Sequence, residues 1–396
     1  MAKEISATLK PAKPPFWNDP VYRALFFQVL VLGGVLALGY VLVSNTLANL
    51  EKQGIASGFG FMKSTAGFSI LMTLIDYTEE DSYFWAFIVS LLNTLLVAGI
   101  GIFFATILGF IVGVARLSSN WVLSKMAAVY IETLRNIPLL LQIFFWYFAV
   151  LRQLPGPRNS VNLFDTFFLN IRGLYSPYPV PEAGFNVVGW SFVVAVAAIF
   201  YIARWAHKRQ EATGQQFHTV YVSLAILIGF PLLASIIMGF PLGWEYPELK
   251  GFNFTGGLSL IPELVALVLA LSLYTASFIA EIVRAGIMAV NHGQTEASYA
   301  LGLRPGPTLR LVVIPQALRV IIPPLTSQYL NLTKNSSLAA AIAYPDIVLV
   351  FAGTILMQTG QAVEIIAITM GVYLTISLLI SAFMNWYNKK MALVER

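Results

Sequence analysis

The sequence predicts an all-α polytopic membrane protein with about eight transmembrane helices. Of its 396 residues, 58% are hydrophobic and 11% are charged, whereas a soluble protein carries roughly a quarter charged residues. The mean hydropathy of +0.75 agrees with this composition. The hydrophobic residues also gather in runs of about 20 residues or more, the length that a helix needs to cross a bilayer. We therefore expect one membrane-embedded bundle rather than several soluble domains.

Eight apolar windows are long enough to form these spans. The first window follows a basic, Pro-rich stretch, but its apolar run is longer than that of an ordinary signal peptide, so we expect this helix to be retained. An even number of spans places both ends of the chain on one side of the membrane. In chain order the windows cover residues 24–43, 85–115, 126–150, 187–204, 219–240, 262–283, 323–345 and 362–386.

The basic residues are divided unequally between the two sides of such a bundle. If the N-terminus is cytoplasmic, sixteen of the 24 Lys and Arg residues fall on that side, six fall on the other, and Arg135 and Lys334 lie inside spans. Since Lys and Arg favour cytoplasmic loops, we expect both termini to be cytoplasmic. The outer segments are rich in Gly, Pro and aromatic residues and predict ordered external loops or short interfacial helices. These segments are 44–84, 151–186 and 241–261.

Several classes of function are disfavoured. The chain has no cysteine, so it cannot form disulfides, a thiolate metal site or a thiol nucleophile. Its three histidines, His207, His218 and His292, are far apart and form no His-Glu-x-x-His pattern, so we expect no metal site. No phosphate-binding Gly-rich loop ending in Gly-Lys-Ser/Thr occurs. The bases are scattered between apolar runs, which does not indicate nucleic-acid binding despite the net charge of +5.

Residues 284–322 form a loop that is too polar to span the membrane. The residues from Gly293 to Leu301 suit a short helix, and Gly302 can adopt the left-handed conformation that ends it. Residues 307–314 predict a second short helix before Pro315. Two short helices joined by a glycine would form a compact unit able to transmit a rigid-body movement.

The spacing within this loop resembles the EAA signature of ABC importer permeases. Glu296-Ala297-Ser298 is followed by Gly302 and, after nine further residues, by an aliphatic run ending in Pro315. Ser298 replaces the second alanine of the usual signature. In that family the loop docks on the ATPase subunit, so the resemblance implies a coupling role; the alternative is an amphipathic helix on the inner membrane surface. The coupling residues would be Gly293, Glu296, Ala297, Ser298, Gly302 and Pro315.

Three further motifs narrow the resemblance to polar amino acid permeases. Tyr130–Gln142 resembles their Tyr-x-Glu-x-x-Arg-x-x-Pro-Leu-Leu-x-Gln stretch, and Ala280–Ile287 with Gly293–Ala297 resembles the segment that leads into their EAA loop. Lys334–Leu338 resembles their Lys-x-Ser/Thr-Ser-Leu. The resemblance covers residues 85–150 and 262–386 and implies a type I importer core of five helices. The N-terminal helix and the inserted pair at 187–240 are similar to additions in the longer permease of general L-amino acid ABC transporters.

The resemblance implies the organisation of the chain. Residues 1–84 would hold a cytoplasmic tail, the first helix and an external loop. Residues 85–386 would form the permease domain, with the insertion at 151–261 and the coupling loop at 284–322. Residues 387–396 would form a cytoplasmic tail.

The resemblance also implies a non-enzymatic role in a bacterial inner membrane, importing L-amino acids by alternating access. The chain would need no cofactor of its own, because ATP and Mg²⁺ would bind to separate ATPase subunits. Its other partners would be a second, related permease in a heterodimer, a periplasmic amino-acid-binding protein and the lipid bilayer.

Two cations at membrane depth are candidate substrate ligands. Arg135 lies about nine residues into its window, or ~14 Å, and Lys334 about eleven residues, or ~16 Å. Cations there are costly unless they are paired, which makes each a functional-site hypothesis. Arg135 could bind a substrate carboxylate, and Pro138 would leave the Leu134 carbonyl free for an ammonium group. Alternatively, Arg135 pairs with Glu132, and Lys334 bonds to carbonyls at a helix end.

Two periodic patterns mark helix faces in these spans. Ser327, Asn331, Lys334 and Asn335 form one polar face, and the substrate-binding candidates are Leu134, Arg135, Asn331, Lys334 and Asn335. Small residues at every fourth position predict close packing against another helix, of this chain or of a partner. These are Gly101, Ala105, Gly109 and Gly113.

Two other classes of function were weighed against the importer. An ion-coupled secondary transporter also places polar residues near mid-membrane, but it predicts internal inverted repeats and acidic residues at depth. The sequence shows no obvious repeat, and its deep charges are cationic. A membrane enzyme is disfavoured because a nucleophile, a metal site and an acid-base constellation are all missing.

Overall fold

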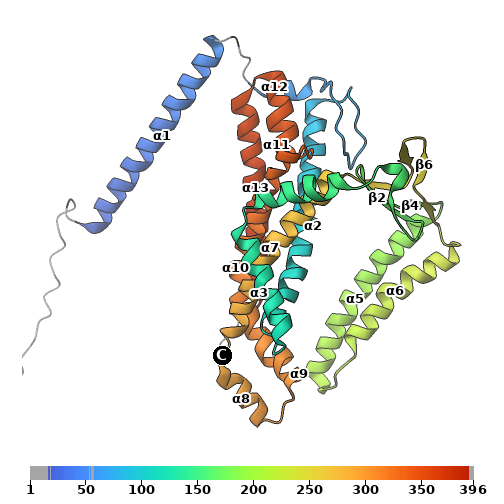
Figure 1. The fold of residues 1–396 in the computed structure, drawn as a ribbon. Helices are drawn as coiled ribbons and strands as arrows, with labels where there is room; N and C mark the ends of the chain where they lie inside the picture. The colour runs from blue at the N-terminus through green and yellow to red at the C-terminus, as the bar shows by residue number, and fades with distance from the viewer. Residues whose placement is uncertain (1–16, 18, 53, 55–57, 392–396) are drawn as a thin grey trace, which may run out of the picture. The chain divides into compact units, whose positions relative to one another are not determined.

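The computed structural model describes residues 17, 19–52, 54 and 58–391 (Figure 1). Within these ranges, seven helices are long and apolar enough to cross a membrane, and eight if one sharply bent pair counts as a single span. This confirms the predicted helical class. The expected N-terminal tail and the last residues of the C-terminal tail lie outside the described residues.

The chain divides into two compact units. One comprises Met1–Ser90 with Ile347–Leu374, and the other comprises Leu91–Asp346 with Thr375–Arg396. Two long helices, α2 (Tyr83–Arg116) and α13 (Ala362–Met391), contribute to both units.

The first unit has a small aromatic core. Phe61 of the 3-10 helix η1 (Phe59–Lys63) stacks on Phe351, with ring centroids 6.4 Å apart, and contacts the ring of Tyr83 at 6.3 Å. The Tyr83 hydroxyl donates to Gln358 Oε1 at 3.0 Å. The surrounding helical segments are α11 (Ile347–Leu349), the π-helical turn η7 (Val350–Ile355) and α12 (Leu356–Thr359).

The first helix, α1 (Pro20–Lys52), is longer than the predicted window 24–43. Every side chain of it that the structure describes is exposed. An apolar helix without a protein partner needs lipid or another subunit around it.

The centre of the second unit is α7 (Pro262–Met288), the most buried of the spans. It packs against α3 (Trp121–Asn136) and α10 (Ile314–Asn335). The small-residue stripe of α2 faces these helices: an added Cβ at Gly101 would lie 3.1 Å from Leu332, and one at Gly109 would lie 2.5 Å from Ile279. The sequence did not say which helix packs against this stripe; the helices that do so belong to this chain.

The predicted straight span at 126–150 is broken. Helix α3 ends at Asn136, α4 (Leu139–Phe144) starts after Pro138, and the two run at 107° to each other before the π-helical turn η2 (Phe145–Val150). Pro138 lacks an amide hydrogen and cannot continue α3. The depth of Arg135 counted along a straight helix therefore does not hold.

Short strands occupy the outer segments, where the sequence predicted loops or interfacial helices. An antiparallel four-stranded sheet has the order β1 (Val161–Leu163), β2 (Phe167–Asn170), β3 (Gly173–Ser176) and β8 (Leu258–Leu260). Two antiparallel pairs join β4 (Tyr178–Pro181) to β5 (Leu242–Glu245) and β6 (Glu248–Lys250) to β7 (Asn253–Thr255). Short 3-10 helices, η3 (Leu151–Gln153) and η4 (Pro157–Asn159), precede them.

The inserted helices form an antiparallel hairpin of α5 (Phe185–Thr213) and α6 (Thr219–Ile237) (Figure 1). They pack along each other, and neither makes an extended contact with another helix of the described chain. Only 6% of the apolar stretch of each is buried, so most of the hairpin surface is apolar and uncovered.

Candidate functional site: a charged cavity and a short polar helix

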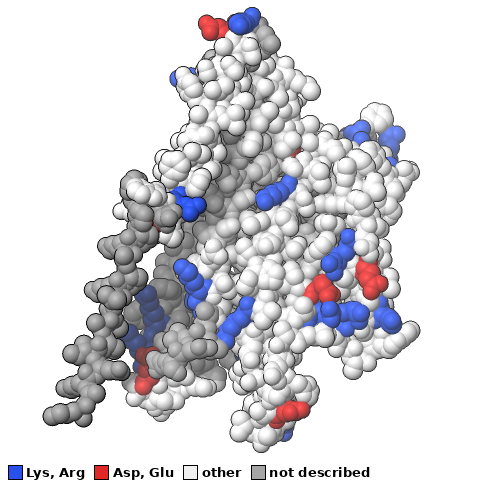
Figure 2. Space-filling view, turned by 90° about the vertical axis from the view of Figure 1, so that its left-hand side faces the viewer, with Lys and Arg blue, Asp and Glu red and all other residues white. Residues whose placement is uncertain are grey.

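Charged side chains meet in a cavity of about 330 Å³ in the second unit. Its walls come from the end of α2, one face of α3 and the last third of α7. Figure 2 shows one face of the molecule on which uncharged residues dominate and charged groups occur in small separate patches. The lining residues are Arg116, Ala128, Ile131, Glu132, Arg135, Glu281 and Arg284.

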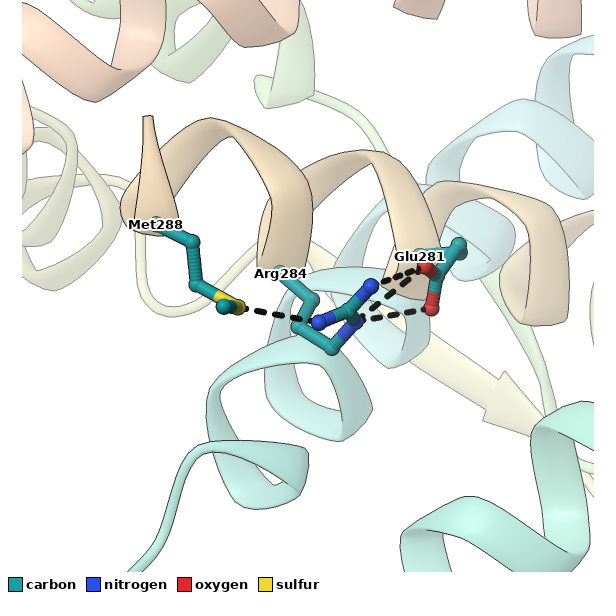
Figure 3. A network of polar contacts seen from close by, with 3 residues as sticks. All are labelled: Glu281, Arg284 and Met288. Carbon is teal, nitrogen blue, oxygen red and sulfur yellow. Dashed lines mark hydrogen bonds and ion pairs between the residues drawn. The ribbon is translucent and has the colours of Figure 1, made fainter. Parts of the chain in front are cut away.

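Two of these charges neutralise each other (Figure 3). Glu281 and Arg284 lie three residues apart on α7, and the Arg284 Nε donates to both carboxylate oxygens at 3.1 and 3.0 Å. One terminal nitrogen of Arg284 lies 2.5 Å from Glu281 Oε1, and the other donates to Met288 Sδ at 2.9 Å. Each of the three guanidinium nitrogens of Arg284 thus has a partner on α7.

Arg135 is the uncommitted cation of the cavity. Its guanidinium lies over the ring of Phe278, 5.0 Å from the centroid. Within the described residues no ion pair or hydrogen bond occupies its donors, so the alternative pair with Glu132 does not form there. Arg116, in contrast, donates to Ser124 at 3.1 Å. Arg135 therefore keeps its planar donor fork available for an anion.

The carbonyl expected to be free for a substrate ammonium group is already used. Gln142 Nε2 donates at 2.9 Å both to the Leu134 oxygen and to the Ile137 oxygen. The side chain thereby caps the end of α3 that Pro138 leaves without donors. Gln142 belongs to the motif that the sequence singled out, but its capping role was not predicted.

The polar face of α10 turns away from the core of its own unit. Ser327, Asn331 and Lys334 are exposed and Asn335 is half-buried, whereas Leu332 between them is fully buried. Within the described chain, no contact joins Lys334 to Arg135. Arg135 and Lys334 both remain predicted substrate ligands.

Tyr130 also joins the helices that hold the cavity. Its hydroxyl donates 2.7 Å to the Leu273 carbonyl of α7. The sequence placed Tyr130 in a motif without assigning it a role. Its position at the start of that motif was the only feature of the sequence that could have indicated this role.

The short helix predicted within the loop at 284–322 is present as α8 (His292–Ala300). The Asn291 side chain caps its N-terminus by accepting from the Gly293 amide at 2.8 Å. Gly302 adopts a φ of +78°, and the Leu303 amide donates to the Ser298 carbonyl at 3.1 Å, as in a glycine-terminated helix.

The candidate coupling residues lie on different faces of this region. Glu296 and Ala297 are exposed, while Ser298 is buried and donates to the Gln294 carbonyl at 2.7 Å. Glu296 Oε1 lies 2.9 Å from His292 Nδ1. Helix α8 therefore presents a partly charged outer surface.

The second predicted short helix does not end at Pro315. A turn, α9 (Pro305–Thr308), leads through the π-helical turn η5 (Leu309–Val313) into α10, and the helical run continues to Ile342 at the end of the 3-10 segment η6 (Ser336–Ile342). The wide π turn accommodates the missing amide hydrogen of Pro315. A short helix followed by one long rod thus replaces the expected pair of short helices.

Comparison with known proteins identifies relatives over nearly the whole chain. A family model described as "Binding-protein-dependent transport system inner membrane component" matches residues 105–393. "General L-amino acid transport system permease protein AapQ" from Rhizobium johnstonii is 56% identical over 96% of this chain and 94% of its own length. "Putative amino-acid ABC transporter permease protein YhdX" from Escherichia coli K12 is 56% identical, over 96% of each chain.

A third relative and one solved structure complete the comparison. "Glutamate/glutamine/aspartate/asparagine transport system permease protein BztB" from Rhodobacter capsulatus is 44% identical over 96% of each chain. The structure titled "Crystal structure of an amino acid ABC transporter with histidines" matches with a TM-score of 0.47 and 20% identity, over 78% of this chain and 95% of the other.

Proposed function

Since the chain belongs to the family of binding-protein-dependent transport system inner membrane components, we propose that it is the permease subunit of an ATP-driven L-amino acid importer. The printed names of the three relatives support an amino acid substrate. Their alignments extend over the inserted hairpin as well as the core. Neither the family nor the relatives give support to an ion-coupled transporter.

Arg135 carries the substrate part of the proposal. Every amino acid has an α-carboxylate, and a guanidinium fork matches a carboxylate with two parallel hydrogen bonds. Arg135 forms no ion pair or hydrogen bond in the described chain, although Glu281 lies in the same cavity, and its stacking on Phe278 holds the guanidinium there. Arg135 is exposed within this chain, so a carboxylate can reach its guanidinium.

Helix α8 would couple this site to ATP hydrolysis on a separate subunit. Its two ends are fixed, by Asn291 at the start and by Gly302 at the finish, so it can move as a rigid body. Beyond the helix, Leu301 is 82% exposed, and an apolar side chain in that position favours a protein groove over water. The long helical run that starts at Pro305 would pass the movement into the membrane.

The remaining partners follow from this assignment. A binding protein would deliver the amino acid on the outer side, where the β-sheets lie, and two ATPase subunits holding ATP and Mg²⁺ would contact α8. A second, related permease would complete the translocation path, because the polar face of α10 has no partner in the described chain. Both termini would then lie in the cytoplasm, in agreement with the distribution of basic residues.

Uptake into proteoliposomes tests the proposal. The complex containing this chain is reconstituted with its binding protein outside and ATP inside, and accumulation of labelled L-amino acids is followed. We expect accumulation that requires ATP and the binding protein. Uptake that persists without ATP and follows an imposed proton or sodium gradient would refute the importer assignment.

A further inference from the structure

The two helices of the inserted hairpin differ in length, although they run side by side. Helix α5 has 29 residues and α6 has 19. The connection at 214–218 compensates for the difference by running back along the last turns of α5. Two contacts demonstrate this path: Phe217 meets Trp205 edge to face, with ring centroids 5.3 Å apart, and Arg209 donates to Gln215 Oε1 at 3.0 Å.

This path places the membrane boundary near Trp205. The stretch from Phe185 to Trp205 is about 30 Å long at 1.5 Å per residue, and α6 is about as long, which matches the hydrocarbon thickness of a bilayer. Trp205 and Phe217 meet at the level where aromatic rings favour the interface. The last turns of α5 and the returning segment therefore lie among or beyond the lipid headgroups.

The residues at this level carry excess positive charge. We call residues 204–218 the basic end of the hairpin. It contains Arg204, Lys208 and Arg209 but only one acid, Glu211, which pairs with His207 at 3.3 Å. All three bases are exposed, and none forms an ion pair within the described chain. They are therefore available to an external anion.

Neighbouring aromatic rings hold two of these bases in place. The Arg204 guanidinium lies 4.3 Å from the centre of the Phe200 ring, and that of Arg209 lies 5.4 Å from the centre of the Trp205 ring. Arg204 and Lys208 are four residues apart, so they project from the same face of α5. The exposed apolar surface of the hairpin continues directly below them.

We propose that the basic end of the hairpin binds the phosphate of an anionic phospholipid, whose acyl chains lie along α5 and α6. A lipid fits better than a soluble partner, because the bases stand at the hydrocarbon boundary and the surface beneath them is apolar. Each base near an anionic membrane surface contributes about a fivefold preference for the charged lipid. Three bases together predict a preference of at least about tenfold, even with partial neutralisation by Glu211.

Native mass spectrometry of the full chain in its complex tests the proposal. Phosphatidylglycerol and phosphatidylcholine with identical acyl chains are titrated onto wild type and onto the variant R204Q/K208Q/R209Q. The control variant R158Q/R172Q/K250Q removes the same charge from the outer region. We expect wild type and control to prefer phosphatidylglycerol by at least about tenfold, and the hairpin variant to lose most of that preference.

Three results would overturn the proposal. One is equal affinity of wild type for the two lipids. Another is a phosphatidylglycerol preference of the hairpin variant within twofold of wild type. The third is displacement of the lipid by millimolar inorganic phosphate, which would assign the bases to a soluble anion. Matching thermal unfolding midpoints of variant and control exclude misfolding as the cause.

Discussion

Replacing Gly113 by alanine should weaken the packing of α2 on α7. A Cβ at this position would lie 2.7 Å from the Ala280 carbonyl oxygen and 2.8 Å from the Val283 Cβ. Neither atom can rotate away, and ordinary contact begins at 3.4 Å, so the helices must separate by about 0.7 Å. Overpacking of this kind costs about 1–3 kcal/mol.

Gly99→Ala on the same helix is the matched control, because a Cβ there meets nothing within 4 Å. Both substitutions gain the same helix propensity, up to about 1 kcal/mol, so their difference isolates the packing effect. The assay is the thermal unfolding midpoint of the purified complex in detergent. We expect Gly113→Ala to unfold a few degrees below Gly99→Ala. Equal midpoints would refute the close approach of α2 and α7.

Three further predictions concern single side chains. Gln142→Leu removes the donor from two carbonyls at the bend between α3 and α4 and should lower the free energy of unfolding by about 1–3 kcal/mol relative to wild type, measured by denaturant unfolding of the purified complex. Asn291→Ala removes the cap of α8 and should destabilise that helix by about 0.5–2 kcal/mol, visible as faster amide exchange at residues 292–300, whereas Asn291→Asp should preserve protection. Burial, with smaller effects from Asp81, raises the pKa of Tyr77 to about 12. Its stabilising contribution should therefore be complete below pH ~10 and lost as the pH rises through about 12. An ultraviolet titration should show one late-titrating phenol fewer in Tyr77→Phe than in wild type; equal numbers would contradict this.

Hydropathy predicted the spans well, because apolar runs of this length have few alternatives to crossing a membrane. It missed the break between α3 and α4, since residues 126–150 are apolar on both sides of the bend. Pro138 indicated a local disturbance, but the direction of α4 depends on packing against α7. The use of the Leu134 carbonyl by Gln142 depends on that bend as well.

The short strands could not be predicted from the sequence, for a different reason. Each has three or four residues, too few for a clear alternation of polar and apolar side chains. Two of the pairings, β3 with β8 and β4 with β5, also join segments on opposite sides of the hairpin insertion; Tyr175, for example, pairs with Ser259. Only the folded chain brings such segments together.

Of the two short helices predicted within the loop at 284–322, only the first was correct. Gly302 and the polar start of α8 are local signals, and the helix forms where they placed it. Pro315 was interpreted as a boundary because proline usually ends a helix. The π turn before it, which no residue pattern announced, lets the helix continue. The charged cavity, in turn, gathers residues from three helices, and only Arg135 among them was proposed as a ligand from the sequence.

The most direct test compares Glu296→Lys with Arg135→Ala in the same reconstituted complex, measuring retention of the ATPase subunits together with ATP-driven amino acid uptake. The account predicts that Glu296→Lys releases the ATPase and abolishes uptake, because it reverses a charge on the exposed face of α8. Arg135→Ala should retain the ATPase but lose most of the uptake. If Arg135→Ala transports as wild type does, or if Glu296→Lys keeps both the ATPase and full uptake, the assignment of these two sites is contradicted.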